Sequence, residues 1–184
     1  FLAPPGATEL RSTLASQLCR ILIVAQQLFG ERDASCMFLG FEFVNGAPRL
    51  LPQHDGKYLI IQLYLNAMHD PVQAYSQLAH EAIHMLSPRR MRAMSVLEEG
   101  LAYFFTNWYI LDNFGVLPPQ SELSSYDEAL NLVDELMCMD GSGIKKMRME
   151  EPTISHFTKE LIMKYYPSLS EDKASQLVAP FERG

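Results

Sequence analysis

Two histidines and a glutamate lie close together in the segment His80-Glu81-Ala82-Ile83-His84. Residues four apart stack on the same face of an α-helix, so both imidazoles can point a ring nitrogen at a single metal ion. Glu81 lies beside that face, where its carboxylate can take the proton of a metal-bound water. The spacing therefore predicts a zinc site with His80 and His84 as ligands and Glu81 as the general base.

The sequence around this motif predicts a helix from about residue 71 to residue 86. Asp70 and Pro71 form an N-cap followed by proline in the first turn, and Pro88 ends the run. Apolar side chains cover most of the helix circumference, as in a helix that runs through a domain interior. One histidine there would more simply be a core residue bonded to backbone carbonyls. Two histidines that flank Glu81 favour a metal site.

A catalytic zinc ion commonly has three protein ligands, so a third ligand is needed. Residues 95–105 resemble the start of a second long helix, which a turn at Ser87-Pro88 would bring back beside the first. Either Glu98 or Glu99 could reach the metal from it. On a helical projection Glu98 borders the apolar side and Glu99 lies nearly opposite, so periodicity alone does not select Glu99.

The motif His80-Glu81-x-x-His84, followed by Glu99 within Leu97-Glu98-Glu99-Gly100-Leu101-Ala102, resembles the signature of the gluzincin metallopeptidases. This clan includes thermolysin and the zinc aminopeptidases. The resemblance covers about residues 70 to 110. It implies Zn²⁺ held by His80, His84 and Glu99, with Glu98 as the alternative ligand or a group behind the ligands. It also implies Glu81 as general base in the hydrolysis of a peptide or protein substrate.

The chain departs from the clan at several points. Thermolysin-like proteins carry an Asp four residues after the glutamate ligand, where it supports a zinc-binding histidine, and this chain has Tyr103 there. The group that orients the histidines is therefore not identified. The short linker between the motifs implies a compact member. The further motifs by which aminopeptidases grip a free amino terminus are missing, so exopeptidase activity is not implied.

The order of elements predicts one α+β, zincin-like domain over residues 1–184, with a small mixed sheet and the active-site helix in an upper lobe, about 8–86. The expected elements before the motif are a helix from Thr8 to about Phe29 and strands at Met37–Val44, 49–51 and 57–65. Asn45-Gly46 predicts a hairpin between the first two strands. In the resembled clan an edge strand lines the cleft, so an extended peptide would add to it by backbone hydrogen bonds.

The second half of the chain predicts a helical lower lobe over about residues 92–180. We expect helices to about Asn113, over Glu122–Met139 and Thr153–Tyr165, and from the Ser170 cap to about Val178, with a turn at 140–143. This lobe would form the far wall of the cleft and supply the group that stabilises the oxyanion. His156 is a candidate because it is the only histidine of this half. The phenol candidates are Tyr103, Tyr126, Tyr165 and Tyr166.

Composition indicates an ordinary soluble domain of 184 residues, 48% hydrophobic and 20% charged. A net charge of −7 without a basic stripe argues against a nucleic-acid partner, and no apolar run is long enough to span a membrane. The three cysteines do not form a disulfide framework, which favours a cytoplasmic compartment. Because the chain begins with Phe1, N-terminal processing or secretion stays open. Nothing indicates the oligomeric state.

Two other functions fit the same motif. A non-catalytic module of the same fold could keep the zinc site to brace its structure, or to bind a peptide without cutting it. Peptide deformylases also carry the two-histidine motif, but their third ligand is a cysteine in a short upstream motif. Cys36 lies in Ser35-Cys36-Met37-Phe38, which is not that motif.

Overall fold

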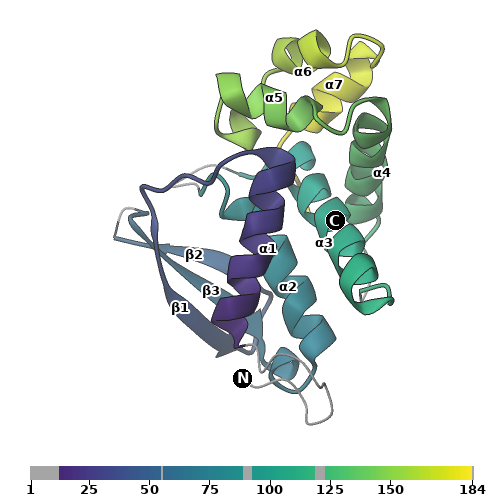
Figure 1. The fold of residues 1–184 in the computed structure, drawn as a ribbon. Helices are drawn as coiled ribbons and strands as arrows, with labels where there is room; N and C mark the ends of the chain where they lie inside the picture. The colour runs from purple at the N-terminus through teal and green to yellow at the C-terminus, as the bar shows by residue number, and fades with distance from the viewer. Residues whose placement is uncertain (1–12, 55, 89–92, 119–122, 184) are drawn as a thin grey trace.

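In the computed structural model of the chain, the structure describes residues 13–54, 56–88, 93–118 and 123–183 (Figure 1). The part before the histidine motif consists of one helix and three strands. The bounds are α1 Leu14–Phe29, β1 Met37–Val44, β2 Arg49–Gln53 and β3 Tyr58–Tyr64. The expected helix from Thr8 thus begins at Leu14 in the described part, with Thr13 as its N-cap. Residues 1–12 lie outside the described ranges.

The three strands form a sheet of order β1-β3-β2, in which β3 runs parallel to β1 and antiparallel to β2. The predicted hairpin between β1 and β2 is therefore wrong, because β3 lies between them. Leu59, Ile61 and Leu63 of β3 are fully buried. Helices α1 and α2 lie beside the sheet (Figure 1). A strand with this much apolar surface is best covered at the centre of a sheet, and the less buried β1 and β2 take the edges.

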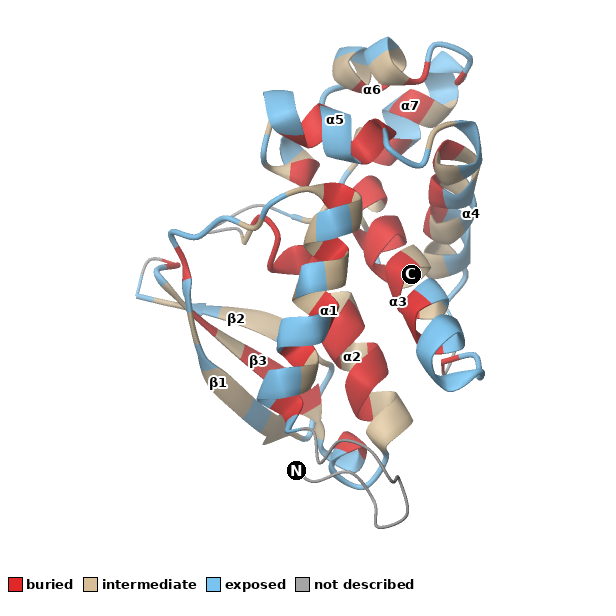
Figure 2. Ribbon diagram, in the orientation of Figure 1, coloured by how far each residue is buried: buried red, intermediate tan, exposed pale blue. Residues whose placement is uncertain are grey.

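The motif helix, α2, spans Pro71–His84 and follows a short 3-10 helix, η1 (Leu65–Met68). The Asp70 side chain accepts a hydrogen bond from the Gln73 N–H at 3.1 Å, and Pro71 occupies the first turn. The predicted helix is confirmed, although it ends two residues earlier. Most residues of α2 from Ala74 to His84 are buried, so this part of the helix runs through the interior (Figure 2).

The second half is helical, as predicted, but its elements differ in detail. Their bounds are α3 Val96–Phe114, α4 Ser124–Met139, α5 Gly143–Glu150, η2 Ile154–His156, α6 Lys159–Tyr165 and α7 Glu171–Val178. The prediction of one helix over Thr153–Tyr165 is wrong, because Thr158 caps a new helix after η2. Helix α5 was missed because its sequence is largely charged, yet it buries Ile144 and Met147.

Helices α3 and α4 pack closely at Gly100. A Cβ at this position would lie 2.4 Å from the carbonyl oxygen of Ala129, so only glycine allows this approach. One turn away, the rings of Tyr103 and Tyr126 stack with centroids 5.0 Å apart. The close crossing therefore brings an aromatic side chain of α4 over the helix that carries Glu98 and Glu99.

Residues 179–183, which we call the C-terminal segment, run antiparallel to the start of α3. The N–H of Val96 donates to the carbonyl of Ala179 at 2.9 Å, and that of Phe181 donates to Met94 at 2.7 Å. One cluster of buried apolar side chains extends from α1 and β3 to α7. The fold is α+β and mostly helical. Within the described ranges, no helix is both long and apolar enough to cross a membrane.

Candidate metal centre

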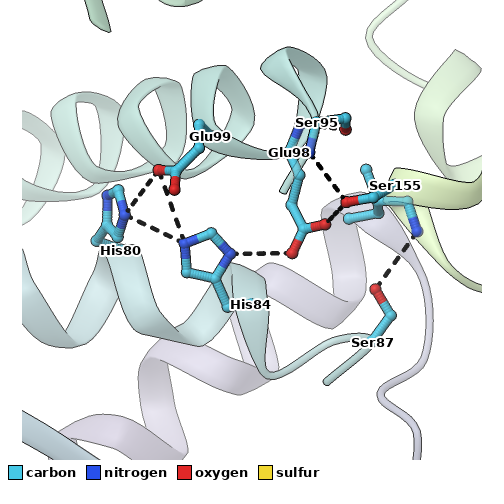
Figure 3. Close-up of polar contacts among 8 residues, drawn as sticks. His80, His84, Ser87, Ser95, Glu98, Glu99 and Ser155 are labelled. Carbon is cyan, nitrogen blue, oxygen red and sulfur yellow. Dashed lines mark hydrogen bonds and ion pairs between the residues drawn. The ribbon is translucent and has the colours of Figure 1, made fainter. Parts of the chain in front are cut away.

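Helices α2 and α3 pack side by side and bring three polar side chains to one point (Figure 3). Nε2 of His80 and Nε2 of His84 lie 3.2 Å apart. Oε2 of Glu99 lies 3.3 Å from the first nitrogen and 3.9 Å from the second. These are the three residues that the sequence motif and the resemblance selected as ligands, and their donor atoms face one another.

This spacing fits a metal ion. A tetrahedral ion with bonds of about 2.0–2.1 Å has ligand atoms about 3.3 Å apart, and two of the three separations are close to that value. Among the described residues, no hydrogen bond reaches the buried Oε2 of Glu81, and the buried Oε2 of Glu99 has only the imidazole contacts given above. Because a buried carboxylate oxygen without a partner is strongly unfavourable, a cation between these groups would satisfy them. The donor set therefore fits a divalent metal, held by His80, His84 and Glu99.

Glu98 points away from this cluster and contacts the far side of His84 (Figure 3). Its Oε1 lies 3.0 Å from Nδ1 of His84, and both side chains are almost fully buried. A carboxylate that accepts from Nδ1–H fixes the tautomer, so Nε2 is left with its lone pair toward the cluster. The carboxylate behind a histidine of the cluster therefore comes from Glu98 and not from the position of Tyr103.

Ser155, at the centre of η2, ties Glu98 to the second half of the chain. Its hydroxyl donates a short hydrogen bond to Oε2 of Glu98 and accepts one from the N–H of Ser95 at 3.2 Å. Ser95 in turn caps α3, because its hydroxyl accepts from the Glu98 N–H. Nothing in the sequence indicates Ser155, since it lies far from both motifs and serine has no characteristic spacing here.

The charges around the cluster shift its protonation. Burial opposes the charged form of His84, but the hydrogen bond to Glu98 and the charges of Glu99, Glu98 and Glu81 raise its pKa to about 9. Burial would likewise raise the pKa of Glu99, but His80, His84 and Arg183 lower it to about 2. The metal-free cluster therefore holds an imidazolium among carboxylates, a place where a divalent cation can replace the proton.

Glu81 lies beside the cluster with its carboxylate buried. Burial raises its pKa, and the charge of Glu99 acts in the same direction, whereas His84, His80 and the backbone N–H of Leu50 oppose the shift. A carboxylate whose pKa is raised is better matched to proton transfer near neutral pH. The Leu50 N–H comes from β2, so the sheet helps to position this side chain.

Glu81 and His80 open into a pocket of about 280 Å³. The wall on the side of α2 is polar, whereas the loop before β2 contributes Ala47 and Pro48. The full set of lining residues is Ala47, Pro48, Gln73, Ser76, Gln77, His80, Glu81, Tyr103, Thr106, Tyr126 and Arg183. Two of the tyrosines considered from the sequence thus border the pocket, and Arg183 was not foreseen.

The other candidate residues lie elsewhere. The structure does not bring His156 into the pocket: its side chain is 44% exposed, and Nδ1 lies 3.7 Å from Oε1 of Glu151. Tyr165 bonds to Glu150, and the hydroxyl of Tyr166 donates to the carbonyl of Asp140. The geometry therefore gives no support to these three as oxyanion donors.

No family model, curated protein or solved structure matches the chain. What the centre can do must therefore follow from its own donors, charges and pocket. The imidazoles of His80 and His84 converge with the carboxylate of Glu99. The carboxylate of Glu98 orients the His84 ring, and that of Glu81 borders an accessible cavity.

Proposed function

We propose that the protein is a compact, zincin-like zinc metallopeptidase that hydrolyses a peptide bond in this pocket. The observation that carries the proposal is the convergence of His80, His84 and Glu99 on one point, with Glu81 buried beside it at the pocket wall. Two histidines and a glutamate are a donor set of catalytic zinc sites, in which the fourth position takes water or substrate. Zinc is therefore our choice of metal.

When bound, zinc would lower the pKa of a coordinated water to about 7 and polarise the substrate carbonyl. Glu81 accepts the proton of the attacking water and returns it to the leaving amine. The Leu50 N–H and the buried surroundings hold its carboxylate toward the pocket. Tyr103 and Tyr126 line the same pocket, and we propose their phenols as donors to the oxyanion.

The alternative is a module that binds zinc without turnover. A structural zinc ion is usually enclosed by four protein ligands. Among the described residues, the cluster contributes three ligand atoms, and His80 and Glu81 border a cavity. This arrangement favours catalysis over a purely bracing role.

The test is a metal analysis combined with the Glu81→Gln variant. Protein purified without chelator should contain one zinc ion and cleave members of a quenched-fluorescence peptide library. Glu81→Gln should keep zinc and the thermal unfolding midpoint but lose at least about 100-fold in kcat, the range of a general base. Full activity in this variant, or zinc-loaded native protein that cleaves no peptide, would contradict the proposal.

As a companion variant, His84→Ala removes a ligand and should lose zinc. The matched control is His156→Ala, which removes an imidazole outside the cluster. It should retain both zinc and turnover.

A further inference from the structure

The free edge of β2 is poor in hydrogen-bond donors. Successive residues of an antiparallel strand point their backbone groups alternately toward and away from the paired strand. Pro52 has no N–H to donate to β3, so its position faces away from that strand, and Leu50, two residues earlier, shares that phase. Pro48, two residues before Leu50, continues the alternation and lines the pocket. Neither proline has an N–H, and the N–H of Leu50 between them acts on Glu81, whose pKa it lowers.

An extended peptide therefore cannot form a regular ladder along this edge, since its carbonyls would find no donors. The expectation that a peptide adds to the edge strand is not supported. The pocket, at about 280 Å³, is also slightly smaller than the range of about 300–1,000 Å³ usual for small-molecule sites. A substrate must then be held by groups other than a long backbone ladder.

Arg183 is the one Lys or Arg side chain among the described residues that line the pocket. Two residues earlier, the backbone of Phe181 is bonded to Met94, and its ring packs on that of Tyr126 with centroids 4.8 Å apart. The segment is thereby fixed against the start of α3. Within the described part of the chain, no ion pair engages Arg183, although its charge lowers the pKa of Glu99. Its side chain lines the pocket, where a ligand can reach it.

We propose that Arg183 binds a carboxylate of the substrate, next to the peptide bond that is cleaved. This inference rests on the proposed peptidase function and names the substrate class. A guanidinium binds carboxylates through two parallel hydrogen bonds, which gives both affinity and orientation. Among the described residues that line the pocket, Glu81 carries the only carboxylate, so this part of the chain offers no separate anion for a substrate ammonium group. The carboxylate is either the free carboxyl terminus of a short peptide or an acidic side chain beside the cleaved bond.

Three matched probes distinguish a free carboxyl terminus from an acidic side chain as the carboxylate that Arg183 binds. They are an N-acylated dipeptide ending in leucine with a free carboxylate, the same compound as its C-terminal amide, and that amide with glutamate in place of leucine. The native protein should cleave at least one carboxylate-bearing probe with a kcat/KM about 10–100-fold above that of the leucine amide, as expected for a charge-assisted pair. In Arg183→Gln this ratio should fall to about 1–3, and Arg183→Lys should restore part of it.

Arg20→Gln, which removes an exposed cation of α1 outside the pocket, is the matched control and should keep the native ratio. Equal cleavage of all three probes by the native protein would overturn the role of Arg183 while leaving the peptidase function intact. The role of Arg183 would also be overturned if Arg183→Gln kept the native ratio of kcat/KM between the carboxylate-bearing probe and the leucine amide.

A binding measurement keeps the inference testable without turnover. Zinc-loaded Glu81→Gln is titrated with the three probes by calorimetry, and a carboxylate-bearing probe should bind at least about tenfold tighter than the leucine amide. Adding Arg183→Gln should abolish the difference. If this preference holds although the native protein cleaves none of the probes or library peptides, the peptidase proposal fails and Arg183 remains a carboxylate-binding residue. Equal or undetectable binding of all three contradicts the inference.

Discussion

Oε1 of Glu98 lies 3.0 Å from Nδ1 of His84, on the side of the imidazole opposite to the nitrogen that faces His80 and Glu99. Adjacent glutamates on one helix thus divide two tasks. Glu99 faces the two ring nitrogens of the candidate metal site, whereas Glu98 contacts the far side of His84. Such outer carboxylates fix ring orientation and raise the basicity of the ligand.

Replacing this supporting carboxylate should weaken metal binding without removing a ligand. We expect Glu98→Gln to reduce zinc affinity by about 10–100-fold, the usual effect of losing an outer partner. Competition with a chromophoric chelator measures the change. Glu160→Gln, an exposed carboxylate at the start of α6, is the control and should bind zinc as the native protein does. Native affinity in Glu98→Gln would show that the contact with His84 does not support the metal.

Without metal, the cluster should make the protein less stable as the pH rises. The pKa of His84 is raised from 6.5 to about 9, so its stabilising contribution is full below pH 6.5 and is lost as the pH rises through 9. The raised pKa of Glu81 acts in the same direction. Urea unfolding in the presence of a chelator should therefore show a decrease of about 1–3 kcal/mol between pH 6.5 and 9.

At low pH the dependence has the opposite sign: the metal-free protein should become less stable as the pH falls. The pKa of Glu99 is lowered from 4.5 to about 2, so its contribution is present above pH 4.5 and disappears as the pH falls toward 2. His54→Asn, which changes an exposed histidine, should keep the whole profile, whereas Glu98→Gln should flatten its alkaline side. A flat profile for the native protein between pH 6.5 and 9 would contradict the assigned charges.

The contact between α3 and α4 should not tolerate a side chain at Gly100. A methyl group there would meet the Ala129 carbonyl at 2.4 Å, so Gly100→Ala must push the helices apart. We expect a loss of about 1–3 kcal/mol in the free energy of unfolding, as for other overpacked positions. Gly46→Ala, with nothing within 4 Å of the added atom, is the control. Unfolding in urea compares the two variants, and equal stability would mean that α4 lies farther from α3.

Arg148 should be among the most important side chains for stability outside the metal centre. Its buried guanidinium donates to the carbonyls of Phe29, Gly30, Glu31, Leu86 and Pro152, which joins the ends of α1 and α2 to the segment after α5. Arg148→Met leaves several buried acceptors without a donor and should cost about 2–5 kcal/mol. Lys146→Met, an exposed cation of the same helix, should cost less than about 1 kcal/mol. Similar thermal unfolding midpoints for the two variants would contradict this role.

Local signals in the sequence were sufficient for the motif helix and its two histidines. Asp70 and Pro71 start α2, and the spacing of His80 and His84 follows from the helical period. The sheet order was not predictable from Asn45-Gly46, because a turn signal cannot reveal that a later strand enters between two earlier ones. Local propensity describes neighbours in sequence, whereas strand order depends on which strand buries the most surface.

The candidate site shows the same division between local and distant information. The pair Glu98 and Glu99 was visible, but their different tasks depend on where η2 places Ser155. Arg183 reaches the pocket through pairing of the C-terminal segment with residues 94–96, a contact without a sequence signature. Both residues depend on contacts between distant parts of the chain, which a single sequence does not reveal.

The bridge between Ser95 and Pro180 has a consequence for how the protein acquires its structure. It joins distant positions, and contacts of large sequence separation form slowly because the intervening chain must first be ordered. Helix α2 can form early from local interactions, but the surroundings of its histidines are complete only when residues 179–183 have docked on the start of α3. During refolding, helical circular dichroism should therefore appear before tight metal binding, and capture of the ion would report the final step of folding.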